Sequence, residues 1–344
     1  MTSATVRRAR SLNRVSRSTV GGLLLLTAVS WGIYQILGNG FLSSYNLFTL
    51  SQLVSETAVI GFSQLVVVVI GRLNLAVGAI GVAVVMFTGW LVGPIGADPL
   101  VGLLAALALG GVLGAILGVL ELVTGLSSFI VTLAMSSIYV GIVLIASGGA
   151  AVSTLPASIT DFGSDSLVVP ALSWLVVPIA GITVLLWLLF HRSNLGWKML
   201  AVGANQRAAE LSGIRVPRIV IGGFALSGVL AAVAALLEMS RVAAALPSLG
   251  VGWLLSSLVV PILGGTPLVG GSVSIGGAVV AALFIESINS GLVSLSVPAY
   301  WQQFAQAIVL LVAVTSDQAR RRRRPPNLAS PTSAPEGSIR HAVP

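Results

Sequence analysis

Residues 100–122 read LVGLLAALALGGVLGAILGVLEL, and Glu121 is the only ionisable residue among them. A membrane-spanning helix needs about 20 predominantly apolar residues in a row, so this stretch predicts a helix that crosses a bilayer. The whole chain has the same character, because 56% of its 344 residues are hydrophobic and 8% are charged. Soluble domains average about 25% charged residues, and apolar runs of this length argue against a large soluble helical core. The sequence therefore predicts an all-α integral membrane protein.

Further apolar runs lie on both sides of this stretch. Together they predict about ten membrane-spanning helices. The runs lie near residues 20–37, 47–70, 75–92, 100–122, 128–146, 169–190, 219–239, 249–263, 273–290 and 299–314. The first run follows a basic segment, as in a signal peptide. It is long for one and more spans follow, so we expect an uncleaved anchor.

Basic residues flank the predicted spans at both ends. Five arginines precede the first span and five follow the last: Arg7, Arg8, Arg10, Arg14 and Arg17, then Arg320, Arg321, Arg322, Arg323 and Arg324. Lys and Arg concentrate in cytoplasmic segments, and an even number of spans returns the chain to the side on which it began. We therefore expect both termini in the cytoplasm, together with the basic loop 191–218. The segments expected outside carry Asp98, Asp161 and Asp165, with Arg241 as the only basic residue near an outer end.

Three regions follow from this pattern. Residues 1–19 form a basic cytoplasmic segment, residues 20–316 the transmembrane domain, and residues 317–344 a basic cytoplasmic tail. The tail is rich in Pro, Ser and Ala, which predicts disorder. The net charge of +8 could indicate nucleic acid. Basic clusters at membrane boundaries, without a folded basic domain, are instead typical of contact with anionic membrane lipids, so we expect no nucleic-acid partner.

The sequence offers few groups for catalysis. It has no Cys and two His residues, of which His191 lies beside a basic segment and His341 in the tail. This composition excludes a thiolate site and disfavours a His-based metal site. Neither an HExxH motif nor a GxxxxGK[ST] phosphate-binding loop occurs. We therefore expect no metal, no cofactor and no enzymatic activity in this chain.

Polar side chains inside the apolar runs are the candidates for a transport pathway, because ionisable groups at membrane depth are costly. Gln52 and Glu56 lie one turn apart in the second predicted span, and Glu286 and Asn289 lie one turn apart in the ninth. These pairs indicate helix faces that line a pathway or a dimer seam. Hydrogen bonds between neighbouring helices are the alternative.

Gly110, Gly114 and Gly118 share one face of the fourth predicted span. Small residues at this spacing let helices approach closely, and packing within the chain is favoured over subunit dimerisation. Glu121 and Glu238 lie near the ends of their spans, where we expect the carboxylates to reach water.

The segment LGWKMLAVGANQRAAELSGIRVP at residues 195–217 is the longest charged stretch between predicted spans. Gln206–Leu211 favour a short helix, which Asn205 can cap and Gly213 can end. A short helix across the inner membrane face suits the transmission of force from a cytoplasmic motor. A solvated connecting loop is the alternative.

The stretch GRLNLAVG at residues 71–78 resembles GGTPLVGG at residues 264–271, with Gly, Leu and Gly at matching positions. Both are predicted as inner-face turns between an inward-running and an outward-running span. This similarity suggests a parallel internal repeat, which is common in transporters. Chance similarity between Gly-rich turns is the alternative.

Five stretches of the sequence carry a family resemblance when they are taken together in order. They are GRLNLAVG at 71–78, SSFIVTLAMSSIYVG at 127–141, VGANQRAAELSGI at 202–214, LGGTPLVGGSVS at 263–274 and INSGLVSLSVPAYWQQF at 288–304. They resemble the permeases of the ribose, xylose and galactose branch of bacterial ABC importers, over roughly residues 45–316. The resemblance implies a plasma-membrane subunit that forms the translocation pathway for a sugar or sugar-like solute.

The resemblance also implies a division of labour among subunits. Cytoplasmic ATP-binding subunits would hydrolyse ATP, an extracytoplasmic solute-binding protein would deliver the solute, and a second permease copy or a paralogue would complete the channel. The residues implied to contact the ATP-binding subunit are Gly203, Asn205, Ala208, Ala209, Glu210, Ser212 and Gly213.

The sequence departs from the family pattern at two places. Asn74 stands where the family has Asp, and Leu254–Ser256 stand where it has an acidic stretch before the Gly-Gly-Thr turn. The missing carboxylates put the usual gating or pairing contacts in doubt, and Asn74 thereby joins the pathway or interface candidates. An ion-coupled secondary transporter of a small polar solute is the alternative function, although the embedded acidic residues are few and all are Glu.

Overall fold

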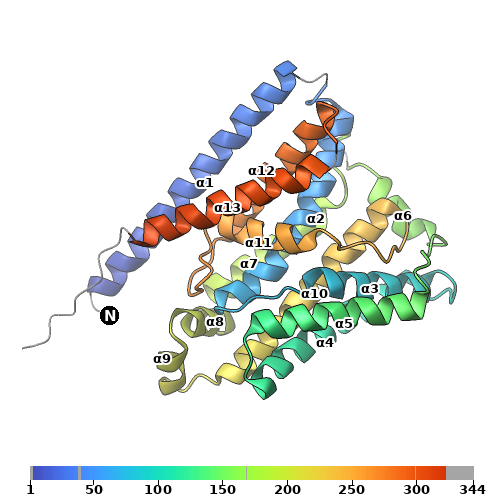
Figure 1. Cartoon of the computed structure of the whole chain (residues 1–344). Helices are drawn as coiled ribbons and strands as arrows, with labels where there is room; N and C mark the ends of the chain where they lie inside the picture. Colours follow the sequence, from blue (N-terminus) through green and yellow to red (C-terminus); the bar gives the residue numbers. More distant parts are fainter. Residues whose placement is uncertain (1–2, 38–39, 168, 299, 323–344) are drawn as a thin grey trace, which may run out of the picture.

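The computed structural model describes residues 3–37, 40–167, 169–298 and 300–322. In this part of the chain the backbone forms α-helices joined by loops, with two isolated β-bridges and no strand (Figure 1). The helices are α1 (Ser3–Leu37), α2 (Ser44–Val69), α3 (Val77–Val92), α4 (Pro99–Thr124), α5 (Ser128–Ser147), α6 (Ala157–Ser164), α7 (Val176–Arg192), α8 (Asn194–Ala204), α9 (Gln206–Leu211), α10 (Val216–Val242), α11 (Trp253–Leu263), α12 (Ile275–Ser294) and α13 (Tyr300–Arg322). The all-α prediction is confirmed. Most of the predicted disordered tail, residues 323–344, lies outside the described residues.

Six helices are long and apolar enough to cross a membrane: α1 from Val20 onward, α2, α4, α5, α10 and α12. Helices α7 and α8 pass the same criterion together, with a bend of 72° between them, and would add a seventh span. Helices α3 and α11 are apolar but shorter. The chain is therefore a multi-pass helical membrane protein, and length and composition identify six or seven spans among the described residues.

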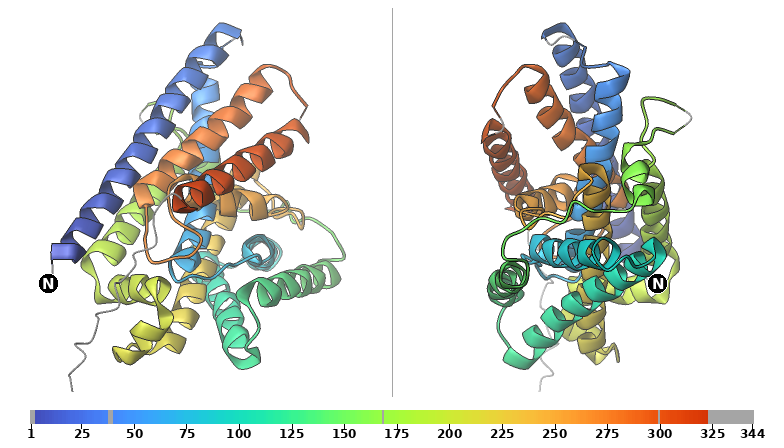
Figure 2. Two further views of the ribbon diagram at one scale, coloured as in Figure 1. Left: turned by 60° about the vertical axis from the view of Figure 1, so that its left-hand side comes forward. Right: turned by 90° about the vertical axis from the view of Figure 1, so that its right-hand side faces the viewer.

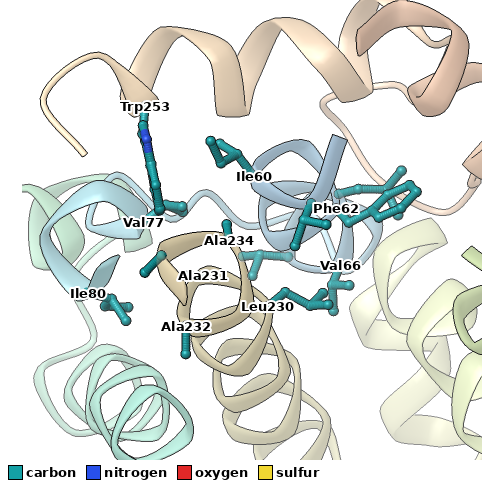
Figure 3. Packing of buried hydrophobic residues seen from close by; sticks show 14 of the residues in the cluster. Ile60, Phe62, Val66, Val77, Ile80, Leu230, Ala231, Ala232, Ala234 and Trp253 are labelled. Carbon is teal, nitrogen blue, oxygen red and sulfur yellow. The ribbon is translucent and has the colours of Figure 1, made fainter. Parts of the chain in front are cut away.

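Helix α2 lies at the centre of the bundle, in contact with α10, α11, α12 and α7. As a result 89% of its most apolar window is buried, compared with 28% for α4, which lies at the periphery. Figure 3 shows the middle of the core, where Ile60 of α2, Val77 of α3, Ala231 of α10 and Trp253 of α11 gather. The core thus joins helices from both halves of the chain.

Helices α4 and α10 pack along a face of small residues. A Cβ atom at Gly110 would clash with the backbone of Gly228, and one at Gly114 would clash with the backbone of Phe224. Glycine at these positions lets the helices approach until backbone meets backbone. The prediction that the face of Gly110, Gly114 and Gly118 packs within the chain is confirmed.

Two predicted spans are helical over only part of their length. Helix α3 has 16 residues and α11 has 11, so at about 1.5 Å per residue they cover about 24 and 17 Å of a hydrocarbon core about 30 Å thick. Non-helical residues precede each of them, 70–76 before α3 and 243–252 before α11. The break before α11 meets the first turn of α3, because a Cβ atom at Gly78 or at Gly250 would collide with the backbone of the other residue.

Side chains satisfy the non-helical backbone that precedes α3. The Leu73 amide donates to Ser128 Oγ of α5 (3.1 Å), and the Leu75 amide donates to Thr132 Oγ1 of the same helix (3.0 Å). The Asn74 amide donates to Gln64 Oε1 of α2 (3.3 Å), and the Ala76 amide donates to the Asn74 side-chain Oδ1 (2.9 Å). Backbone at membrane depth must find its hydrogen bonds inside the protein, and these four contacts meet that requirement.

The two ends of the bundle carry different short helices. Helix α6 packs against the last turns of α10, where Ser240 Oγ donates to the Ile159 carbonyl oxygen of α6. Helices α8 and α9 lie at the opposite end, next to the start of α10 (Figure 2). In Figure 1 the first turns of α1 and the last turns of α13 lie toward α8 and α9. We call these two ends the α6 end and the α9 end.

Candidate functional site

Asn205 separates α8 from α9 and caps the shorter helix. Its Oδ1 accepts a hydrogen bond from the Ala208 amide at 3.0 Å. Gly213 follows the helix at a φ of +80°, a left-handed conformation that favours glycine. The sequence prediction of a capped helix over Gln206–Leu211 is therefore confirmed.

The residues that the family resemblance singles out in this segment differ in exposure. Five of the seven are exposed at the α9 end: Asn205, Ala208, Glu210, Ser212 and Gly213. Ala209 is buried and Gly203 is half-buried. The first five are accessible to a partner, whereas the last two shape the segment from within.

Gly203 lies where three backbone segments meet. A Cβ atom at this position would clash with the Val69 carbonyl oxygen at the end of α2 and would lie 2.7 Å from the Gly271 amide nitrogen. That amide donates to the same Val69 oxygen at 2.9 Å. The two Gly-rich turns that resemble each other in sequence thus lie side by side against the end of α8. We call Gly203 with residues 69–72 and 269–271 the turn junction.

Arg72 connects the turn junction to two helices. Its Nη2 donates to Gln206 Oε1 of α9 at 3.1 Å, and its Nε forms an ion pair with Glu121 Oε1 near the end of α4. The Glu121 side chain is only 7% exposed. The prediction that Glu121 reaches water is therefore wrong, because the chain before α3 turns back and brings Arg72 onto the carboxylate.

A second group of polar side chains joins α2, α10 and α12 inside the bundle. Arg241 Nε of α10 lies 2.6 Å from Glu56 Oε1 of α2, and the two side chains are 26% and 6% exposed. Glu286 of α12 accepts hydrogen bonds from Thr57 Oγ1 at 2.6 Å and from Asn289 Nδ2 at 3.1 Å. Buried charges persist in proteins when they are paired and hydrogen-bonded. We call these five residues the buried polar cluster.

Gln52 lies one turn before Glu56 and reaches a different partner. Its Nε2 donates to the Gly163 carbonyl oxygen of α6 at 2.6 Å. Gln52, Glu56, Glu286 and Asn289 are all buried within the chain. Gln52, Glu56 and Glu286 bond to neighbouring helices, which is the alternative that the sequence left open, whereas Asn289 bonds to Glu286 on its own helix. Their role in a pathway or a dimer seam stays a prediction.

Asn74 fixes the break before α3 against α10. It is 1% exposed, its Nδ2 donates to Ser227 Oγ at 3.0 Å and its Oδ1 accepts from the Ala76 amide. Ser227 Oγ also lies 3.1 Å from Ser63 Oγ of α2. Asn supplies both a donor and an acceptor, whereas an ionised Asp could only accept, so the departure from the family pattern at this position changes which hydrogen bonds can form.

In the described part of the chain, no three His, Asp or Glu side chains are arranged to hold a metal ion. The other departure from the family pattern, Leu254–Ser256, lies in the first turn of α11. Leu254 is exposed there, so an acidic side chain at this position would not be buried within the chain.

Comparison with known proteins places these features in a family. The family described as "Branched-chain amino acid transport system / permease component" matches residues 18–314. The chain belongs to this permease family. The permease is 32% identical to the ribose import permease of Escherichia coli strain K12 over 310 residues, which cover 88% of this chain and 94% of the relative.

Two other relatives are similar over most of their length. The permease is 33% identical to the D-allose transport system permease of Escherichia coli strain K12, over 81% of this chain and 85% of the relative. It is 28% identical to the fructose import permease of Rhizobium meliloti, over 86% of this chain and 83% of the relative. No solved structure matches the chain.

Several polar residues of the permease carry no distinctive signal in the sequence. Thr132 and Ser227 lie in apolar runs, where small hydroxyl side chains commonly bond to their own helix. Arg241 stands at a predicted outer end, so its pairing with Glu56 depends on how α10 packs on α2. The polar character of these positions is visible in the sequence, but their partners are not.

Proposed function

We propose that this permease is the membrane-spanning subunit of an ATP-driven importer for a sugar or sugar-like solute. Relatives named for the import or transport of ribose, D-allose and fructose match it over most of their length, which supports a sugar as the solute. ATP would be bound and hydrolysed by separate cytoplasmic subunits, in keeping with the lack of a GxxxxGK[ST] loop in this sequence.

The observation that carries the proposal is the contact of Gly203 with both Gly-rich turns. A force applied to α9 would reach the end of α2 through Gly203 and the end of α4 through Arg72. The ATP-binding subunits would dock on the exposed residues of this segment: Asn205, Ala208, Glu210, Ser212 and Gly213. Gly203 and Ala209 would pass the movement inward.

We further propose that the chain crosses the membrane ten times. The six long apolar helices, together with α3, α7, α11 and α13, give ten crossings. Residues 70–76 and 243–252 would complete the crossings of α3 and α11 in non-helical form. Both termini, with residues 1–19 and 317–344, would then lie in the cytoplasm at the α9 end. The close contact of the two Gly-rich turns supports a parallel internal repeat.

The α6 end would face outward and receive the solute-binding protein. A second permease copy or a paralogue would complete the pathway. Gln52, Glu56, Glu286 and Asn289 are buried within one chain, so a role in the pathway requires that α2, α10 and α12 separate during transport. Separation of α2 from α10 would break the ion pair between Glu56 and Arg241 and expose both charges to the pathway.

Reconstitution tests this function directly. The permease would be placed in proteoliposomes with the ATP-binding and solute-binding proteins that co-purify with it from native membranes, and uptake of radiolabelled ribose, allose and fructose would be measured. We expect uptake that requires ATP and all of the components. Uptake by the permease alone, driven by an ion gradient, would instead establish the secondary transporter.

A further inference from the structure

An apolar hollow of about 360 Å³ lies between α7, α8 and α10 near the α9 end. Its lining consists only of aliphatic side chains, Met and Gly: Leu185, Leu186, Leu189, Leu195, Met199, Ile219, Gly222, Gly223 and Leu226. Leu185 and Leu195 are 65% and 49% exposed, so the hollow opens to the surroundings of the protein. Water would find no hydrogen-bond partner on these walls, so an apolar occupant is favoured.

The bend between α7 and α8 places the hollow at the edge of the membrane. The chain turns by 72° there, and Ser193 caps α8 by accepting from the Gly196 amide at 3.1 Å. Two tryptophans mark this level. Trp197 on α8 is exposed, and Trp187 on α7 lies under the Arg192 guanidinium, 5.9 Å from its ring centre. Trp side chains gather at the boundary between lipid and water.

Three exposed cations lie next to lining residues in the sequence, on the elements that form the hollow. Arg192 follows the lining residue Leu189 by one helical turn, Lys198 precedes Met199, and Arg218 lies one turn before Gly222. The ion pairs formed in the described part of the chain involve none of these three cations. Each of the three elements that form the hollow thus supplies one positive charge without a carboxylate partner.

We propose that this hollow is a binding site for an anionic phospholipid. One acyl chain would lie among the leucines of α7, α8 and α10, and the phosphate would lie between Lys198, Arg192 and Arg218. A zwitterionic lipid could fill the same hollow, but its headgroup carries no net charge to complement the three cations. The site needs only that the chain spans a membrane, so it does not depend on the identity of the solute.

Gly222 provides the means to test the apolar part of the site. A Cβ atom at Gly222 would meet no other atom within 4 Å, so a larger side chain enters the hollow without disturbing the helix. The Gly222→Leu variant therefore fills the hollow. Gly141→Leu on α5 is the matched control, because a Cβ atom there also meets nothing within 4 Å.

The experiment is native mass spectrometry of the purified full-length permease, titrated with phosphatidylglycerol or with phosphatidylcholine. We expect one tightly bound phosphatidylglycerol per chain, lost in Gly222→Leu and retained in Gly141→Leu. The Lys198→Gln, Arg218→Gln double variant changes two exposed side chains and should weaken phosphatidylglycerol binding about 25-fold, at about fivefold for each cation near the headgroup. Its affinity for phosphatidylcholine should not change.

Arg207→Gln on α9 is the control for loss of charge outside the hollow, and phosphatidylglycerol binding should be unchanged in it. Two results would overturn the proposal. One is equal affinity of the unaltered permease for both lipids. The other is full retention of phosphatidylglycerol by the double variant and by Gly222→Leu. Because no ATP-binding subunit takes part, these outcomes are independent of the transport measurement.

Discussion

At Gly203 the chain passes so close to the end of α2 and to the turn before α12 that a single methyl group has no room. The atoms that a Cβ would meet are backbone atoms of Val69 and Gly271, which cannot turn aside as the end of a long side chain can. In the proposed mechanism, these rigid contacts would pass a movement of α8 to both turns. Replacement of Gly203 should therefore affect the stability of the permease and its coupling to ATP hydrolysis together.

We predict that Gly203→Ala lowers stability and uncouples transport. Overpacking of a well-packed site costs about 1–3 kcal/mol, and α8 must shift away from the turn junction to accept the methyl group. The thermal midpoint of the purified permease should fall, and ATP-dependent uptake per ATP hydrolysed should fall with it. Gly141→Ala, where the added methyl group meets nothing within 4 Å, should change neither quantity. Normal uptake by Gly203→Ala would show that the turn junction does not carry the coupling.

Asn74 supports a second prediction at the scale of one residue. Asn74→Ala removes the acceptor of the Ala76 amide and the donor to Ser227, which leaves buried polar groups unsatisfied at a cost of about 1–3 kcal/mol. Thermal unfolding in detergent should show this loss. Asn74→Asp keeps the acceptor for Ala76 and can accept from the Ser227 hydroxyl, so it should retain part of the stability that Asn74→Ala loses. A fully stable Asn74→Ala variant would mean that the break before α3 is held by its other contacts.

At the scale of helices, α2 and α10 each supply the partner for a charged side chain of the other. Glu56 and Arg241 form an ion pair at 2.6 Å between these helices, and Thr57 carries the contact on to Glu286 of α12. Each helix thus presents to the other a group that would be costly alone in a bilayer. The pair binds the two helices in one register, because a shift by one turn would separate the charges.

We predict that Glu56→Gln destabilises the permease by about 3 kcal/mol, because the Arg241 charge loses its partner in a mostly buried site. Arg241→Gln should have a similar effect. The double variant Glu56→Gln, Arg241→Gln should be more stable than either single variant, since neither member of the pair is then left charged without the other. Thermal and denaturant unfolding would measure all three. Arg207→Gln is the control. It removes an exposed pair at 3.9 Å to Glu210 and should cost less than about 1 kcal/mol of stability. If the losses of the two single variants simply added up in the Glu56→Gln, Arg241→Gln double variant, the pairing would be contradicted.

The helices were easier to predict than their breaks and partners. The apolar run 100–122 and the capped helix after Asn205 follow from local rules, and both occur in the structure. The turn at residues 71–76 was also expected, but the hydrogen bonds from two of its amides to Ser128 and Thr132 on another helix do not follow from such rules. Only the tertiary contacts show how the amides of this turn are satisfied.

The same distinction applies to the candidate site. The sequence identified Glu56 and Glu286 as unusual because a carboxylate in an apolar run is conspicuous on its own. It did not identify the partner of either, since Arg241 reaches Glu56 through the packing of α10 on α2 and Thr57 reaches Glu286 through the packing of α2 on α12. Glu121 shows the opposite error, because proximity to a span end suggested water where the fold provides Arg72.

For the whole molecule, the topology is the prediction that can be tested most directly. The chain contains no Cys, so single cysteines can be introduced without removing others. Asp161 on α6 and Arg207 on α9 are exposed at opposite ends of the bundle. In right-side-out vesicles that contain the permease alone, a membrane-impermeant maleimide should label Asp161→Cys and not Arg207→Cys, and inverted vesicles should give the reverse. Labelling of both from one side would rule out the proposed ten crossings.

The central position of α2 has a consequence for how the permease is made. Its most apolar window has a mean hydropathy of 1.6, compared with 2.5 for α4, so α2 has the weaker tendency to enter lipid unaided. Arg241 follows Glu56 by 185 residues, and at about 5–20 residues per second a ribosome needs about 10–40 s to synthesise the stretch between them. During that interval the carboxylate of Glu56 lacks the arginine it will pair with. An α2 that enters lipid before α10 emerges therefore carries Glu56 without its partner, and slower synthesis would lengthen this period.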